Sequence, residues 1–153
     1  MAGEPVVTLV GNITRDPELR FTPSGKAVVK CNLAVTPRKK NRDTDRWEDM
    51  DTMWFQVSAW DQMAENVAES LSKGDRVVVV GRMSMRKYQT DSGEERQSWE
   101  IQADEISPSL RWAHAKAQKV GRSGGGPAPA NDDPWNTGAS APAGAGFSDE
   151  PPF

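Results

Sequence analysis

The chain has 153 residues, with 19 lysines and arginines, 22 aspartates and glutamates, one cysteine and a formal net charge of −3. This length suits one domain of ordinary size with a tail, and the lone cysteine, Cys31, excludes an internal disulfide. No apolar run is long enough to span a membrane, and the N-terminus lacks the features of a signal peptide, so we expect a cytoplasmic protein.

The charge is distributed unevenly along the chain. All 19 basic residues and 18 of the 22 acidic residues lie at or before Arg122, so that part carries a formal charge of +1. The last 31 residues hold four acidic residues and no basic one, which gives −4. Such asymmetry is typical of a body that faces nucleic acid and carries an acidic appendage.

The N-terminal third of the chain reads as strands. Residues 6–13 are a β-rich run, and the Pro-Ser-Gly-Lys sequence at 23–26 predicts a turn. Residues 27–36 alternate in polarity and predict a second strand. Its inward face carries four apolar side chains: Val29, Cys31, Leu33 and Val35. Residues 37–51 are polar and charged, and they predict a mobile loop.

A helix is expected after a third strand at residues 52–60. Asp61 is a candidate N-cap for a helix over 62–71, and Lys73 with Gly74 suits its C-terminal end. The helix has one apolar stripe, because three apolar residues recur every four positions: Met63, Val67 and Leu71.

Two further strands are expected at residues 76–88 and 97–106, around a hairpin turn at 91–94. Three strands, a helix and two strands make the plan of the OB-fold, an all-β, five-stranded barrel with one helix between strands three and four. We therefore predict an OB-fold domain over residues 1–112. Residues 121–153 are rich in Gly, Pro and Ala, and they predict a disordered tail.

Strand parity predicts a surface for unpaired nucleic acid. Successive side chains of a strand point to opposite faces, so Trp54 and Trp60 share the more polar face of the third strand. The matching face of the fourth strand carries Arg82, Ser84, Arg86 and Tyr88. Flat rings stack on exposed bases and cations bind phosphates, which together favour single-stranded DNA. A second core face or a subunit interface is the alternative for the two tryptophans.

Other aromatic and basic residues have less definite positions. Trp47 lies in the polar loop, where it can either stack on a base or pack the loop, whereas the parity of Trp99 favours the core. Residues 37–42 contain four cations, among them Arg38 and Lys39. Such a run is either a solvated charge cluster or a set of phosphate contacts beside the aromatic face.

Several segments together resemble the bacterial single-stranded DNA-binding protein family. The segments are LVGNITRDPELRFTPSGKAV (9–28), NLAVT (32–36), WFQVSAWDQMAENVAESLSKGDRVVVVGR (54–82), MRKYQTDSGEERQ (85–97) and the terminal SDEPPF. The resemblance implies an OB-fold, a homotetramer that wraps DNA, and roles in replication, recombination and repair without a cofactor.

The resemblance also implies roles for individual residues. Trp54, Trp60 and Tyr88 match the family's stacking aromatics, and a further stacking tryptophan of the family would fall at Lys39, where this chain departs from the pattern. Four basic residues match phosphate contacts of the family: Arg20, Lys73, Arg86 and Lys87.

The segment at 107–119 resembles the actinobacterial branch, in which an extra strand clamps a neighbouring subunit, so residues 113–120 are a candidate interface extension. A helix is the alternative for its Ala-rich second half.

The tip at 148–153 resembles the family's peptide for recruiting other proteins, and it contains Asp149, Glu150, Pro151, Pro152 and Phe153. Its Phe and carboxylates suit a pocket with a cationic rim.

The sequence argues against an enzyme. His114 is the only histidine, so no Cys–His or Ser–His–Asp set can be assembled, and no zinc signature is present. We therefore expect no catalytic residues, no metal and no cofactor. An RNA-binding OB domain, a primosomal OB protein and a purely structural oligomer remain as rival interpretations, although primosomal proteins normally lack an acidic Phe tip.

Overall fold

The computed structural model describes residues 3–121, and the chain divides into two compact units, Met1–Lys116 and Ala117–Phe153. The first unit contains all the secondary structure of the described residues. The tail predicted over 121–153, with its tip at 148–153, lies outside the described residues except for Gly121.

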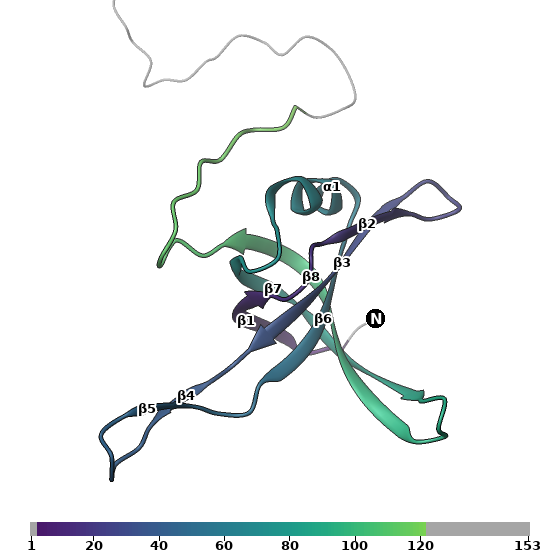
Figure 1. Ribbon diagram of the computed structural model, residues 1–153. Helices are drawn as coiled ribbons and strands as arrows, with labels where there is room; N and C mark the ends of the chain where they lie inside the picture. Colours follow the sequence, from purple (N-terminus) through teal and green to yellow (C-terminus); the bar gives the residue numbers. More distant parts are fainter. Residues whose placement is uncertain (1–2, 122–153) are drawn as a thin grey trace, which may run out of the picture. The chain divides into compact units, whose positions relative to one another are not determined.

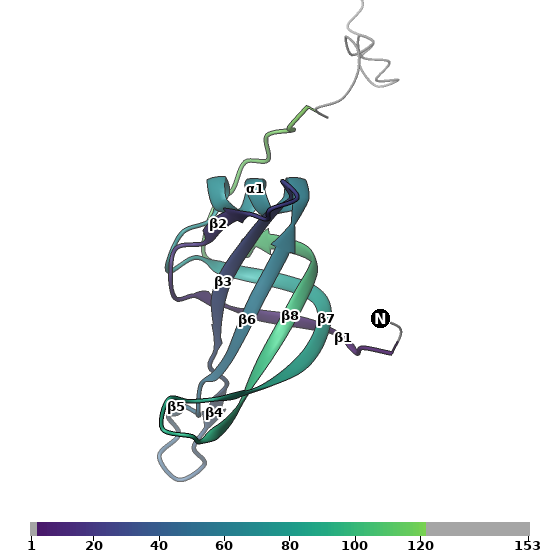
Figure 2. The same cartoon turned by 90° about the vertical axis from the view of Figure 1, so that its right-hand side faces the viewer.

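The first unit is a curved sheet with one helix (Figures 1 and 2). Its elements are β1 (Val6–Ile13), β2 (Glu18–Phe21), β3 (Ala27–Val35), β4 (Arg38–Lys40), β5 (Trp47–Asp49), β6 (Met53–Trp60), α1 (Asp61–Ser70), β7 (Arg76–Gln89) and β8 (Glu95–Pro108). The strands of the main sheet are ordered β1-β7-β8-β6-β3-β2, and a further pairing joins β1 to β3.

That further pairing closes a ring of five strands. β6 and β8 pair in parallel, whereas the other neighbours in the ring are antiparallel. The closure needs a close approach of β1 to β3, because a Cβ atom at Gly11 would lie 2.5 Å from the carbonyl oxygen of Ala34. With α1 between the third and fourth strands of the ring, the predicted OB-fold is confirmed.

The core lies inside the ring and is formed by alternate residues of its strands. Seven of the largest side chains there are almost fully buried: Ile13, Val29, Leu33, Val57, Val77, Val79 and Ile101. Each such side chain stabilises the fold by roughly 1.5–3 kcal/mol relative to full exposure. From α1, Ala64 and Val67 are buried against the same core, so the helix covers one end of the ring.

The segment predicted to be a loop contains a second, two-stranded sheet. β4 and β5 pair antiparallel, and two ion pairs join the arm, Arg38 to Asp49 at 2.8 Å and Lys40 to Asp45 at 2.6 Å. The prediction was wrong here because each strand has only three residues, all of them exposed, so they show no apolar alternation. Figure 1 shows this arm and the β7–β8 hairpin extending away from α1.

The start of α1 also differs from the prediction. The N-cap residue is Trp60, which has an extended backbone, and no side chain caps the helix. Asp61 is the first helical residue, with a φ of 54°, a left-handed conformation that Asp tolerates better than most residues. The chain therefore turns from β6 into α1 within one residue, which keeps Trp60 on the strand.

The end of α1 agrees with the prediction to within one residue. The helix ends at Ser70, Leu71 is its C-cap, and the amide of Leu71 donates to the carbonyl of Val67 at 2.9 Å. The amide of Lys73 donates instead to Asp16 Oδ1 at 2.8 Å, so Lys73 joins the turn after the helix to the loop before β2. Gly74 lies in that turn with a φ of 93°.

Trp99 is not a core residue, contrary to its predicted position. Its side chain is 42 % exposed, although it lies on the same face of β8 as the buried Ile101. The reason is the length of the hairpin, since β7 and β8 both continue past the end of the core. Among the described residues, no helix is long and apolar enough to cross a membrane.

Candidate nucleic-acid interface

The outward face of the main sheet carries polar and aromatic side chains that the strand registers bring together. Directly paired residues on neighbouring strands share a face. Here we call this face of β3, β6, β8 and β7, with the adjoining β2, the platform; Figure 2 shows these strands side by side. From β6 it includes Trp54, Gln56, Ser58 and Trp60.

Two tryptophans stand at the two ends of the platform strand β6. Trp54 is 61 % exposed and Trp60 is 39 % exposed. Six positions on a strand correspond to about 20 Å. The partners of the two tryptophans on β3 are the small residues Ala34 and Val28. Both rings are therefore accessible for stacking, and the alternative of a second core face within this chain is wrong.

The β2–β3 side of the platform lies next to β6 between the two tryptophans. Lys30 of β3 pairs with Ser58 of β6 and with Glu18 of β2, while Asn32 pairs with Gln56. A pocket of about 260 Å³ opens here, lined by Arg15, Asp16, Glu18, Arg20, Lys30, Cys31, Asn32 and Gln56. Cationic and amide groups therefore gather between the tryptophans.

The acids of this pocket already have partners. Glu18 forms an ion pair with Arg20 at 2.9 Å, and Asp16 accepts the backbone amide of Lys73 at 2.8 Å. Neither Arg15 nor Lys30 forms an ion pair with any residue in the described range 3–121. Two cations on this side are thus available to an anion from outside the chain.

The β7–β8 side of the platform carries Arg82 and Arg86. Arg82 forms an ion pair with Asp104 at 3.3 Å, and Arg86 forms one with Glu100 at 3.6 Å. Asp104 is the extra residue of a bulge in β8, because Val80 pairs with Glu105 and Gly81 pairs with Ala103. Both arginines on this side therefore have acidic neighbours.

Tyr88 continues the platform along the β7–β8 hairpin. It has the same parity as Arg86, is 45 % exposed and pairs with Arg96. The position of the tyrosine beyond the core leaves its ring open, with a cation directly opposite. The predicted aromatic residues Trp54, Trp60 and Tyr88 thus occur on one face.

Four predicted basic contacts lie off the platform. Arg38 and Lys39 are on the β4–β5 arm, where Arg38 is held by Asp49. Lys87 has the opposite parity to Tyr88 and forms an ion pair with Glu95 at 3.6 Å. Lys73 lies in the turn after α1, tied through its amide to the Asp16 loop. Three predicted cations remain: Arg82 and Arg86 lie on the platform, and Arg20 lines the pocket.

Sequence reasoning missed Arg15 and Arg96 as platform-side cations. Arg15 lies in the loop between β1 and β2, and no periodic pattern could connect it to the pocket. Arg96 is identified only once the β7–β8 register places it opposite Tyr88. Lys30 and Asn32 had a usable signal, since they are the polar positions of the alternating strand β3.

Burial changes the chemistry of one side chain at the pocket. Burial raises the pKa of Cys31 from its usual 9.0 to about 11, so the thiol stays protonated and uncharged at neutral pH. Within residues 3–121, no group of three or more His, Cys, Asp or Glu side chains is placed to hold a metal ion.

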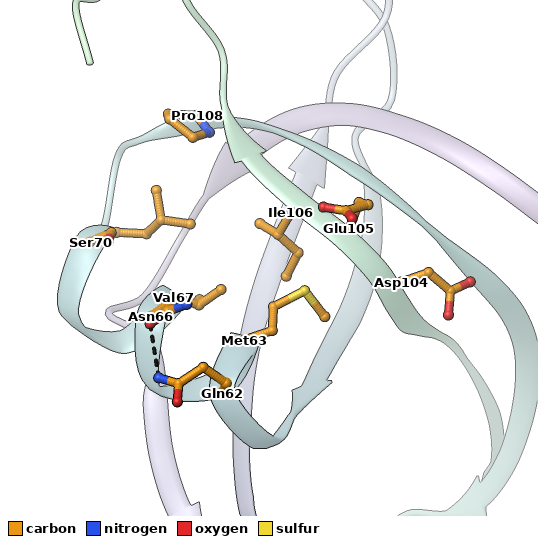
Figure 3. Close-up of a pocket in the computed structure, with 10 residues that line it drawn as sticks. Gln62, Met63, Asn66, Val67, Ser70, Asp104, Glu105, Ile106 and Pro108 are labelled. Atoms are coloured by element: carbon orange, nitrogen blue, oxygen red, sulfur yellow. Dashed lines mark hydrogen bonds between the residues drawn. The ribbon is translucent and has the colours of Figure 1, made fainter. Parts of the chain in front are cut away.

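A second pocket lies between α1 and the end of β8 (Figure 3). Its volume is about 510 Å³, and Met63, Val67 and Ile106 give it an apolar lining. At the rim, Gln62 donates to Asn66 at 3.2 Å, and Asp104 and Glu105 add negative charge. No basic residue lines it, so it does not suit a phosphate backbone.

Known proteins share both the sequence and the fold. The family model described as "Single-strand binding protein family" matches residues 5–109. The "Single-stranded DNA-binding protein" of Mycobacterium tuberculosis is 48% identical over 164 residues, and that of Paenarthrobacter aurescens is 47% identical over 171 residues; both alignments cover 100% of each chain. A crystal structure of a small single-stranded DNA-binding protein from Streptomyces coelicolor superposes with a TM-score of 0.64 at 37% identity, over 70% of this chain and 95% of that chain. The chain therefore belongs to the single-strand binding protein family, as the motif resemblance predicted.

Proposed function

We propose that this protein binds and protects single-stranded DNA without sequence specificity during replication, recombination and repair in the cytoplasm. The main support is the pair of exposed rings, Trp54 and Trp60, at the two ends of a strand with cations beside it. Every base has a flat face, so stacking binds all bases, whereas a duplex hides those faces. Similarity to proteins named single-stranded DNA-binding proteins adds independent support.

A fluorescence titration tests this proposal. Oligo-dT should quench the tryptophan emission strongly, and a duplex of equal length should quench it little. Binding should weaken as salt increases, because cation–phosphate contacts release counterions. An absence of quenching by oligo-dT, together with unchanged migration of the DNA in a gel, would exclude the proposal and favour a structural role.

Assembly into a homotetramer is the second part of the proposal. Within the described residues, β1 pairs with β7 along its length but with β3 only at Asn12 and Ile13, so the other edge of β1 is free before those two residues. Val6 and Val10 on that strand are 67% and 39% exposed. A free edge beside apolar side chains suits pairing with a second copy. Sedimentation equilibrium should give four times the chain mass of 16.8 kDa.

Recruitment of replication and repair proteins is the third part, and it depends on the acidic tip with Asp149, Glu150 and Phe153. An aromatic end with an α-carboxylate and neighbouring acids suits an apolar pocket rimmed by cations. Phe153→Ala should greatly weaken binding to purified partner proteins and leave DNA binding unchanged. Equal partner binding by both forms would exclude the tip as the recruiting element.

A further inference from the structure

The pocket on the β2–β3 side of the platform lies where a DNA strand between the two tryptophans would pass. Its row Lys30–Ser58 is two positions from Trp60 along β6, and its row Asn32–Gln56 is two positions from Trp54. A strand stacked on both rings would therefore cross these two rows. The side chains on either side of β6 at these two rows would then determine where the sugar-phosphate backbone binds.

The β2–β3 side and the β7–β8 side of the platform differ in whether their cations form ion pairs. Arg15 and Lys30 are exposed and form no ion pair within residues 3–121, whereas Arg82 and Arg86 already have Asp104 and Glu100 as partners. A phosphate that approached either arginine would also approach a carboxylate. A phosphate in the pocket would meet Arg15 and Lys30, which form no such ion pair in the described part of the chain, and the nearby Glu18 is already paired with Arg20. Three basic and two acidic side chains line the pocket, which leaves it a formal charge of +1.

The uncharged groups of the pocket favour an anion as well. The side chains of Asn32 and Gln56 are half-buried, pair across β3 and β6, and can donate amide protons to phosphate oxygens. The acid Glu18 is held by Arg20, and Asp16 by the amide of Lys73. The remaining potential charge is a cysteine thiol that stays protonated.

We propose that this pocket is a phosphate site, built around Arg15 and Lys30, that places the backbone of the bound strand along the β2–β3 side of β6. The proposal rests on the single-stranded DNA binding proposed above and adds the path of the strand. Bases then extend from the β3 side toward Trp54 and Trp60, and Arg82 and Arg86 lie at their far edge.

Single substitutions test the path through the salt dependence of binding. For single strands, the slope of log affinity against log salt changes by about 0.7 for each phosphate contact. Lys30→Ala and Arg15→Ala should each reduce the slope by about that amount, and the double variant by about twice as much. Lys119→Ala is the matched control, because it removes one positive charge in the second unit; its slope should equal that of the unchanged protein.

A strand of abasic deoxyribose phosphates separates phosphate contacts from base contacts. Lys30→Ala should weaken binding of this strand, whereas Trp54→Ala should not, because no base is present to stack. If Lys30→Ala weakens binding of oligo-dT but not of the abasic strand, the pocket contacts bases and the phosphate assignment is wrong.

The experiments give different results depending on whether the proposed function or the proposed phosphate site is wrong. If the unchanged protein does not bind oligo-dT, the proposed function fails. If it binds but the Lys30→Ala and Arg15→Ala slopes match that of Lys119→Ala, only the path is wrong. A reduced slope for Arg82→Ala and Arg86→Ala alone would place the backbone on the β7–β8 side. Thermal unfolding of each variant checks that these exposed substitutions leave the fold intact.

Discussion

On the β2–β3 side of the platform, Arg15 and Lys30 form no ion pair within residues 3–121, whereas on the β7–β8 side Arg82 and Arg86 each lie within 3.6 Å of a carboxylate. Sequence similarity suggests basic contacts on both sides, and a count of cations would rank them alike. The difference comes from the acidic neighbours that strand register provides. The proposed phosphate site therefore rests on cations that form no ion pair within the described residues, rather than on the number of cations on each side.

Removal of the Trp54 side chain, which lies between the two sides of the platform, should have the largest effect on DNA affinity. Trp54→Ala should weaken oligo-dT binding by about 1–3 kcal/mol, on the order of 5- to 150-fold, because it removes one stacking surface. A filter-binding or fluorescence-anisotropy titration measures the loss. Trp54→Phe is the control and should retain most of the affinity.

Trp47 provides the comparison for that loss. It is 58 % exposed on the β4–β5 arm, opposite Lys40, and it is not on the platform. Trp47→Ala should therefore weaken binding less than Trp54→Ala. Equal losses would mean that the arm contributes a stacking surface as important as the platform itself.

The uncharged state of Cys31 beneath the β2–β3 side should affect stability at high pH. The pKa of Cys31 is about 11 in the folded protein and 9.0 ordinarily. The protonated thiol therefore contributes fully to the free energy of unfolding below pH 9, and this contribution is lost as the pH rises toward 11. Between pH 8 and pH 10 the free energy of unfolding should fall by on the order of 1 kcal/mol from this group.

Urea unfolding of the unchanged protein and of Cys31→Ala at both pH values measures this contribution. The variant lacks the thiol, so its decrease between the two pH values should be smaller by that amount. Parallel decreases in the two proteins would mean that the folded thiol ionises at its ordinary pKa and that the pocket gains a negative charge in mild alkali.

Removal of the carboxylates should make the two sides more alike. Glu100→Gln removes a negative charge from the platform and frees Arg86 from its partner at 3.6 Å, so affinity for oligo-dT should increase by about threefold, while the salt slope should change by less than the roughly 0.7 of a full phosphate contact. Glu18→Gln, which frees Arg20 at 2.9 Å, is the matched change on the other side. No gain from Glu100→Gln would show that Arg86 is out of reach of the strand.

The acidic tip should have the smallest effect on DNA binding. Deletion of residues 148–153 should leave the affinity unchanged or raise it by up to about twofold, because the tip's acids compete with phosphates for the same cations. Competition titrations at low salt are the most sensitive measurement. A large drop in affinity would contradict a role confined to protein recruitment.

The sequence predicted the positions of residues whose placement depends on their own strand, and it did not predict those that depend on contacts between distant segments. Parity alone put Trp54 and Trp60 on one face, and the five principal strands followed from periodicity. The ion pair of Arg82 depends on a bulge at Asp104, and the position of Arg15 depends on how a loop meets β3. Such contacts depend on register between distant segments, which no short window of sequence contains.

The same reason explains the failure at the β4–β5 arm. Strands of three exposed residues contribute nothing to the buried core, so hydrophobic alternation has no role in forming them. Cross-strand ion pairs such as Arg38–Asp49 accompany the pairing instead. The prediction for Trp99 was wrong for a different reason. Strand parity gave the correct face of β8, but it could not reveal that the hairpin continues past the core.

The closed ring also has a consequence for how the domain folds. Val6 at the start of β1 pairs with Arg82 in β7, so the ring joins segments that are far apart in the chain. Such non-local pairing must overcome loop-closure entropy first, and domains of this kind fold on the order of milliseconds to seconds. The 10-residue helix α1 is too short to persist alone and cannot act as an early, stable nucleus. The strands of the platform therefore reach their final register only after segments that are distant in the chain have paired.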